Sequence, residues 1–362
     1  MTFSIYNLST FFRWIDESLR SAMPAFWAVT IEWVIVGLIY LLFFAVMGLF
    51  LVYAERKVCA FMQNRIGPNR VGPYGFFQTI ADFVKLMLKE LIPIKLSDKF
   101  LFNLAPFIVV IVSFLTLSAI PFGPSLQALD FDIGILYVTA VSAMGVIGYL
   151  LAGWSSNNKY SLVGGMRSGA QIISYELSVG LSLMTIIVLA GTMQFSEIVQ
   201  LQSGGWFIFK GHLPAFLAFI LFLISSTAEI NRGPFDLAEA DSELTAGYHT
   251  EYSGIKFGLF YVSEYMNMFI VSAIAVTVFL GGWMPFHVSG WDGFNHVMDF
   301  LPPLVWFIGK TFFVIWVIMW FKWTFPRLRI DQLLTLEWKY LLPINLVNIL
   351  IMSFVVLMGW HF

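Results

Sequence analysis

Residues 31–53 read IEWVIVGLIYLLFFAVMGLFLVY, and Glu32 is the one charged side chain in this run. A helix needs about 20 consecutive, mostly apolar residues to cross the hydrocarbon core of a bilayer. Seven further runs of the same kind follow along the chain. The expected membrane spans are residues 31–53, 100–122, 132–153, 172–193, 213–230, 257–281, 303–323 and 341–360. The sequence therefore predicts an all-α polytopic membrane protein with about eight transmembrane helices.

The composition of the 362-residue chain indicates the same class. Its residues are 59% hydrophobic and only 12% charged, whereas an average soluble domain carries about 25% charged residues. So few charges cannot cover a water-facing surface, which excludes a soluble enzyme and a nucleic-acid-binding protein. The single cysteine, Cys59, excludes a disulfide framework and an iron–sulfur cluster held by this chain alone. Because no span carries a central histidine for haem ligation either, we expect no metal site and no redox centre here.

The basic residues gather in alternate loops of the chain. Sixteen of the 20 lysines and arginines fall there. These loops are residues 54–99, 154–171, 229–256 and 322–340. By the positive-inside rule they face the cytoplasm or matrix, and both termini face the opposite side. We call these two sides the inner and the outer end.

The chain is expected to contain one transmembrane domain, residues 31–362, since no low-complexity linker divides it. Residues 1–30 form a separate N-terminal arm with two interpretations. The apolar spacing over residues 8–23 suits a helix in the membrane interface, and a loosely ordered segment is the alternative. Lys310, inside the seventh span, either reaches the outer interface or pairs within the bundle.

The first inner loop combines a rigid turn with an amphipathic helix. Two Gly-Pro dipeptides shape the turn over residues 65–73. Apolar residues then recur at helical spacing through residues 76–91, with Asp82 and Lys85 on the polar side. One interpretation is an interfacial helix anchored by lysines. The other is the floor of an access path for an amphipathic ligand, whose polar head would meet Arg56 and Arg65.

Acidic residues concentrate in the third inner loop. Pro234 suits the first turn of a helix, and the spacing from Asp236 to Glu239 and Glu243 would place three carboxylates on one helix face. Glu229 and Glu251 flank this stripe. One interpretation is a solvated acidic helix that docks on a basic partner. The other is a cluster that exchanges protons, because desolvated neighbouring acids share them.

Apart from acids at the span boundaries such as Glu32, two acids lie within the predicted spans, Glu176 in the fourth and Glu264 in the sixth. A carboxylate in hydrocarbon costs several kcal/mol unless it is paired or faces a wet cavity, so intramembrane acids are functional candidates. The seventh span ends in a basic turn that carries Arg327 and Arg329. The simplest interpretation of that turn is a positive-inside anchor.

Several of these motifs together resemble one family. They are Glu55-Arg56-Lys57, the Arg65–Pro73 turn, Gln78-x-x-x-Asp82-x-x-Lys85, Ser174-Tyr175-Glu176, Pro234-Phe235-Asp236-Leu237-x-Glu239, Ser242-Glu243-Leu244 and Pro326-Arg327-x-Arg329-x-Asp331-Gln332. They are similar to signatures of the quinone-site membrane subunit of respiratory complex I, the proton-translocating NADH:quinone oxidoreductase. The resemblance extends over residues 31–360. Asp241, where the family usually has Glu, and Phe83, at a position expected to be smaller, depart from it.

The resemblance implies an eight-helix subunit that belongs to a translocating enzyme and has no redox centre of its own. Quinone would be the substrate, and FMN, NADH and iron–sulfur clusters would be bound by partner subunits. The partners would be quinone-site subunits of the peripheral arm, small neighbouring membrane subunits and lipid. The quinone chamber would include Arg56, Arg65, Asp82, Lys85, Arg327 and Arg329. Coupling to proton translocation would involve Tyr175, Glu176, Glu229, Asp236, Glu239, Glu243, Glu251 and Glu264.

Two other functions are compatible with parts of the sequence. One is the related membrane subunit of an energy-converting hydrogenase or formate hydrogenlyase, which reduces no quinone. The other is a free-standing cation/proton transporter, which would work without partner chains. The long 65–90 loop favours the complex I subunit over the first. The acids lie mainly in inner loops and no internal repeat is evident, which argues against the second. We expect the bacterial inner membrane as its location, with the mitochondrial inner membrane as the alternative.

Overall fold

The computed structural model describes residues 21, 24–92, 94–124, 126–238, 241–287 and 291–360. The helix predicted at residues 8–23 falls outside them, apart from residue 21. The described helices are α2 (Ala25–Met62), α3 (Gln78–Leu88), α4 (Lys99–Ser118), α5 (Gly134–Ser155), α6 (Lys159–Ala190), α7 (Phe195–Leu201), α8 (Phe207–Lys210), α9 (His212–Glu229), α10 (Asp241–Leu244), α11 (Gly254–Phe279), α12 (Asp292–Met298), α13 (Pro303–Thr324), α14 (Ile330–Thr335) and α15 (Leu342–Leu357). A π-helical turn, Leu336–Leu341, joins α14 to α15.

The prediction of an all-α membrane protein is confirmed. Within the described part of the chain, eight helical segments are long and apolar enough to cross a membrane, with α14, the π turn and α15 counting as one. The helices extend beyond the predicted spans at their inner ends. For example, α2 continues to Met62, and α6 begins at Lys159 rather than at residue 172. Polar residues can continue a helix outside the hydrocarbon, so an apolar run marks only the part within the membrane.

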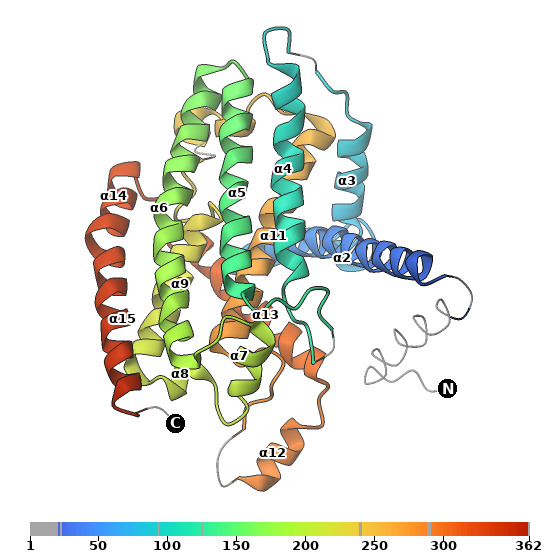
Figure 1. Ribbon diagram of the computed structural model, residues 1–362. Helices are drawn as coiled ribbons and strands as arrows, with labels where there is room; N and C mark the ends of the chain where they lie inside the picture. Colours follow the sequence, from blue (N-terminus) through green and yellow to red (C-terminus); the bar gives the residue numbers. More distant parts are fainter. Residues whose placement is uncertain are drawn as a thin grey trace.

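One helix occupies the centre of the bundle. In its most apolar segment α11 has 83% of its residues buried, against 17% for α2. Figure 1 shows α4, α5 and α6 side by side, with α2 crossing the bundle at a steep angle. The connection from α3 to α4 and the connection from α5 to α6 lie at one end, and α14 lies toward that end of α15. The short helices α7, α8 and α12 lie at the other end, near the C-terminus.

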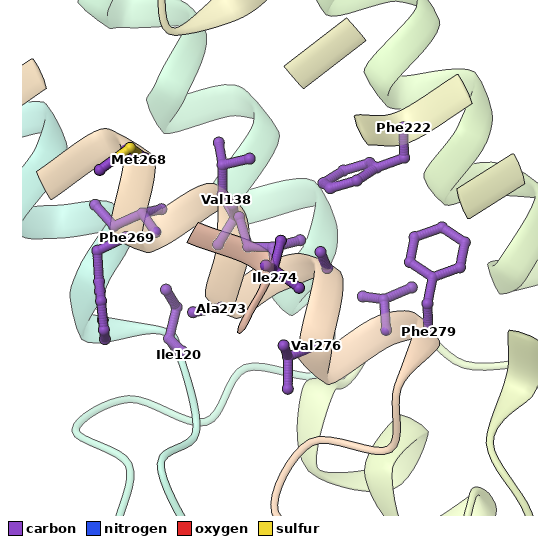
Figure 2. Close-up of a cluster of buried hydrophobic side chains, with 14 of the residues drawn as sticks. Ile120, Val138, Phe222, Met268, Phe269, Ala273, Ile274, Val276 and Phe279 are labelled. Carbon is purple, nitrogen blue, oxygen red and sulfur yellow. The ribbon is translucent and has the colours of Figure 1, made fainter. Parts of the chain in front are cut away.

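The core forms where α11 packs on its neighbours (Figure 2). Phe279 of α11 meets Phe222 of α9 with 5.6 Å between ring centroids. Ile274 of α11 lies near Val138 of α5, and Ile120 closes the cluster just beyond α4. Because lipid tails are as apolar as these side chains, close packing rather than burial from water holds such helices together. Size changes in α11 are therefore poorly tolerated.

The contact between α5 and α6 depends on a glycine. A Cβ atom on Gly153 would lie 2.6 Å from the carbonyl oxygen of Ser161 and 3.0 Å from the Cα atom of Gly165. Real Cβ atoms do not come that close to backbone atoms, so the two helix backbones can approach only without a side chain there. This approach places the inner end of α6 beside α5.

The last span is a helix with an irregular turn. Pro343 has no N–H group to donate to the carbonyl of Lys339, and its ring clashes with that carbonyl in a regular α-helix. The π turn over Leu336–Leu341 lies directly before this proline. Such turns arise where the hydrogen-bond ladder is interrupted, and they often occur at functional sites. Glu337 lies within this turn and is fully buried.

Candidate functional site

Four charged side chains from four elements meet at the inner end of the bundle. Arg232, in the loop after α9, donates from Nη1 to Oε2 of Glu55 on α2 at 2.7 Å. Its Nε atom lies 2.9 Å from Oε1 of Glu264 on α11. Lys322 of α13 donates to Oε1 of Glu55 at 2.7 Å. The guanidinium of Arg232 also stacks on the ring of Tyr265, with 4.1 Å to the centroid. We call Glu55, Arg232, Glu264 and Lys322 the charge cluster.

Pairing makes the burial of these charges tolerable. Arg232 is 2% exposed and Glu55 5% exposed, and an unpaired charge at such a site would cost several kcal/mol. The two carboxylates and two cationic side chains balance formally. Of this cluster, the sequence pattern predicts a functional role for Glu264 alone. It misses Glu55, Arg232 and Lys322, because no spacing along the chain indicates that these four residues meet.

A cavity of about 480 Å³ opens beside the charge cluster. Its lining includes Arg232 and, from the first inner loop, Arg56 and Arg65. Arg65 is exposed, and its Nε donates to Gln63 at 2.7 Å. The Nη2 atom of Arg232 is buried and makes no hydrogen bond within the described residues. The cavity therefore offers cationic donors to a ligand.

The predicted amphipathic helix of the first inner loop is α3, and its polar side docks on α2. Asp82 accepts from Nη1 of Arg56 at 2.5 Å and from Nε2 of Gln78 at 3.1 Å, with Lys85 at 3.9 Å. Burial raises the pKa of Asp82. The hydrogen bonds from Arg56 and Gln78 and the nearby positive charges outweigh this and lower the pKa below its ordinary value. The carboxylate therefore stays ionised and ties α3 to α2.

A second cavity, of about 260 Å³, lies between α2, α3 and α11. Most of its lining is apolar, and Arg56, Asp82 and Lys85 provide its charged residues. This cavity and the one at the charge cluster have Arg56 and Tyr261 in common. An apolar compartment and a charged compartment therefore adjoin at the inner end of the bundle.

The sequence predicts that Asp236, Glu239 and Glu243 share one helix face, and this prediction is wrong. The helix described here, α10, comprises only Asp241–Leu244, and Asp236 lies in a non-helical segment before it. Glu239 lies outside the described residues. Phe235 and Leu237 are both buried against apolar residues of α6 and α14. The N–H group of Leu237 donates to the carbonyl of Phe235 at 3.0 Å, a tight turn that an α-helix does not contain.

The acids of this loop instead meet basic residues of the same chain. Oδ2 of Asp236 lies 3.1 Å from Nη2 of Arg327. Arg167 of α6 donates to Glu243 at 2.6 Å. This hydrogen bond lowers the pKa of Glu243, and the charges of Arg327 and Arg329 lower it further. The basic turn before α14 thus faces the acidic loop, and both ion pairs are partly exposed to solvent.

Two of the remaining predicted acids lie close to each other. Glu229, at the end of α9, is partly buried, lines the same cavity as Ser142 of α5 and interacts with the charge of Glu176 on α6. This cavity has a volume of about 70 Å³ and contains the polar side chain of Asn267. Glu251 lies elsewhere and accepts from Nδ2 of Asn158 at 2.6 Å.

Tyr175, a predicted coupling residue, and Lys310, for which the sequence left two interpretations, both bond to backbone carbonyls of the same chain. The hydroxyl of Tyr175 donates to the carbonyl of Leu333 on α14 at 2.9 Å, and the side chain is fully buried. Lys310 pairs within the protein. Its Nζ donates to the carbonyls of Leu280, Gly282 and Met284 at 2.7, 3.0 and 2.6 Å and lies 4.4 Å from the ring of Trp206.

Comparison with known proteins identifies the family. A family model described as NADH dehydrogenase matches residues 35–353. The chain is 60% identical over 358 residues to the H subunit of the NADH-quinone oxidoreductase of Bacteroides fragilis, covering 99% of this chain and all of the relative. It is 46% identical over 330 residues to the protein of the same name from Brevibacillus brevis, covering 91% and 95% of the two chains. A third relative, an H subunit of the same enzyme from Geobacter metallireducens, is also 46% identical, over 331 residues, with 88% and 95% covered. The chain belongs to the family of H subunits of NADH-quinone oxidoreductase.

Proposed function

We propose that the two adjoining cavities receive a quinone, in a chain that serves as a membrane subunit of an NADH:quinone oxidoreductase. The observation that carries the proposal is that an apolar cavity and a cationic cavity share Arg56 and Tyr261. A quinone has an apolar tail and a head group with two carbonyl oxygens. The tail fits the compartment between α2, α3 and α11, and the head fits the compartment beside the charge cluster.

The cationic side chains suit the chemistry of the head group. Guanidinium groups of Arg65 and Arg232 can donate charge-assisted hydrogen bonds to the carbonyl oxygens. Reduction of the quinone takes up two electrons and two protons and gives the quinol. Negative charge develops on the oxygens while electrons arrive ahead of protons, and fixed cationic donors stabilise that charge. FMN, NADH and iron–sulfur clusters of partner subunits would supply the electrons.

Coupling to proton translocation would begin at the charge cluster. Glu264 contributes to the lining of the cationic cavity and belongs to the central helix α11. A new negative charge in the cavity competes with Glu55 and Glu264 for Arg232, which alters the pairing of both acids. Protons would then redistribute over the predicted acids. These are Glu176, Glu229, Asp236, Glu239, Glu243, Glu251 and Glu264, with Tyr175 beside them.

The exposed basic residues at the inner end suit contact with a peripheral arm. Arg65, Arg327 and Arg329 are all exposed there. The partners would be the quinone-site subunits of that arm and the small membrane subunits beside this chain. The location would be the inner membrane of a bacterium, which agrees with the bacterial source of the relatives described above.

A pair of substitutions at Gly258 tests the proposed path of the tail. Gly258 of α11 lines the apolar cavity, and a Cβ atom there would make only ordinary contact with Leu86 at 3.5 Å. Gly258→Ala should therefore leave turnover unchanged, whereas the side chain of Gly258→Leu should fill the cavity. We expect Gly258→Leu to raise the KM for a long-tailed quinone about tenfold and to affect a tailless analogue much less. Equal kinetics of the two variants with the long-tailed quinone would contradict the path.

The comparisons do not favour either alternative function. Each of the three relatives described above carries the name NADH-quinone oxidoreductase. A free-standing transporter would move cations or protons in liposomes that contain this chain alone, and we expect no such transport.

A further inference from the structure

The interface of α6, α9 and α15 contains polar side chains that the proposed function does not use. Glu337 in the π turn is fully buried and accepts a hydrogen bond from Ser178 of α6, which is also fully buried. Further along the last span, Asn345 is fully buried and Asn348 is 1% exposed. Ser225 of α9 is fully buried as well. We call Glu337, Ser178, Asn345, Asn348 and Ser225 the polar file.

Many atoms of the polar file make no hydrogen bond to the described part of the protein. They are Oε2 of Glu337, Oδ1 and Nδ2 of Asn345, Oδ1 of Asn348 and Oγ of Ser225. Among the described residues Glu337 forms no ion pair. Its carboxylate charge interacts electrostatically with the hydroxyl of Tyr175. Nearly all buried polar groups in proteins are hydrogen-bonded, and where protein partners are lacking, ordered water supplies the bonds.

The members of the polar file follow one another across the membrane. α6 and α15 run in the same direction, and Tyr175 and Ser178 contact Leu333 and Glu337 in register. The same offset places Asn345 about level with Ile186, about two turns nearer the outer end than Ser178. Nδ2 of Asn348 donates to the carbonyl of Pro214 at the outer end of α9, at 2.9 Å. Leu341 lies between Glu337 and Asn345 and forms the apolar part of the path.

The polar file ends in a cavity at the outer end of the bundle. This cavity has a volume of about 500 Å³, and its lining combines Asn348, His212 and Trp360 with five apolar residues. His212 and Trp360 both line it, and a ring nitrogen of His212 lies 2.6 Å from the carbonyl oxygen of Trp360. Asn348 therefore connects the buried side chains to a compartment at the outer face.

We propose that a file of water molecules fills this interface and that Glu337 exchanges protons with the outer face through it. A proton passes along the water from the outer cavity to the Glu337 carboxylate, and the return of the proton restores the ion. The inference depends on the proposed function only in that it is measured on the assembled enzyme. Glu337 is distinct from the acids around the quinone cavities. The water file predicts an effect on proton movement rather than on quinone binding.

Two variants and a control test this route in the whole purified complex, reconstituted into liposomes with a pH-sensitive dye. Glu337→Gln removes the exchangeable proton, and Asn345→Leu removes the polar group halfway along the file. Both should lower the initial rate of proton translocation to about half or less. Their rate of NADH oxidation with an uncoupler present should stay at the wild-type level. Glu197→Gln, an exposed acid near the outer end, should leave both rates unchanged.

The outcomes separate this inference from the proposed function. Unchanged proton translocation in Glu337→Gln would overturn the inference, and so would an equal loss of translocation and of uncoupled NADH oxidation. Equal kinetics of the Gly258→Ala and Gly258→Leu variants would contradict only the proposed path of the quinone tail. If the variants do not assemble, a structure of the wild-type complex tests whether the water file exists. A density map that resolves water should show water within about 3.2 Å of Oε2 of Glu337 and of the Asn345 amide, and a dry interface would refute the file.

Discussion

Arg232 and Glu55 lie 177 positions apart in the chain, yet Nη1 of Arg232 donates to Oε2 of Glu55 at 2.7 Å, with both side chains buried. This contact joins the loop after α9 to the inner end of α2. It also fixes one wall of the cationic cavity, because both residues line it.

Removing Arg232 should destabilise the protein strongly. In Arg232→Met the carboxylates of Glu55 and Glu264 lose a buried partner, and breaking a buried pair costs about 3–5 kcal/mol. We expect a lower melting temperature of the purified complex and less assembled enzyme in the membrane. Arg70→Met, a change at an exposed arginine of the first inner loop, is the matched control. Equal melting temperatures for the two variants would show that the pairing does not stabilise the fold.

Arg65 should act on ligand binding instead of stability, because its side chain is exposed at the rim of the cationic cavity. A hydrogen bond to a charged group contributes about 1.5–3 kcal/mol, so Arg65→Ala should weaken a quinone-site inhibitor about 10- to 100-fold. Inhibition curves of NADH:quinone activity measure this effect. Arg70→Ala is the control, and inhibition that is the same in both variants would remove Arg65 from the site.

The docking of α3 should depend on pH through Asp82. The pKa of this carboxyl is lower in the folded protein than in an unfolded chain. Its stabilising contribution is therefore complete above the ordinary carboxyl range and disappears as the pH falls through the lowered value. We expect protease cleavage between α2 and α3 to increase in acid for the wild type. Asp82→Asn should be cleaved faster than the wild type at neutral pH, and its cleavage rate should increase little further in acid. The ratio of the cleavage rates of the variant and the wild type at each pH measures this effect.

Glu229 should contribute to coupling without being needed for assembly. Glu229→Gln removes a charge that interacts with Glu176 and keeps a polar side chain of the same size. We expect lower coupled NADH:quinone turnover and slower proton translocation, with a normal amount of assembled complex. The same experiment applies to Glu243→Gln, whose ion pair with Arg167 is exposed and contributes under about 1 kcal/mol to stability. Wild-type turnover and translocation in both variants would exclude these acids from the mechanism.

Lys310 should be a structural residue at the outer end of α13. Lys310→Met leaves the carbonyls of Leu280, Gly282 and Met284 without this donor, and each buried unsatisfied group costs about 1–3 kcal/mol. We expect a clear fall in the melting temperature of the complex. Quinone affinity of the remaining folded enzyme should not change, since the residue is far from the inner cavities along the bundle. A loss of affinity without a loss of stability would contradict this role.

Local sequence patterns predicted the membrane spans and the amphipathic helix, because both depend on the spacing of nearby residues. The apolar runs predicted the spans, and the spacing around Asp82 predicted the amphipathic helix α3. The helical stripe from Asp236 to Glu243 failed because its apolar neighbours, Phe235 and Leu237, are drawn into a distant apolar cluster. A spacing argument assumes a helix, and here tertiary packing selects a tight turn instead.

The charge cluster and the polar file could not be predicted from the sequence for a related reason. Lys322 and Glu55 are 267 positions apart, and only the packing of α2, α11 and α13 brings them together. Glu337 fell in a stretch assigned to an inner loop, because Lys339 and the basic residues before α14 suggest water. The buried position of Glu337 follows from the helical continuation through the π turn, which no apolar run reveals.

The π turn also limits how the length of the last span can vary. The buried positions Leu333, Glu337, Leu341 and Asn345 are spaced by four residues, and each such step drifts about 40° around a regular α-helix. The wider π turn absorbs this drift and keeps all four side chains on one side. A regular α-helix with the same number of residues over this stretch would rotate α14 by about 100° relative to α15. Substitutions that let the stretch adopt regular helix geometry without shortening it should therefore misalign the buried side chains of α14.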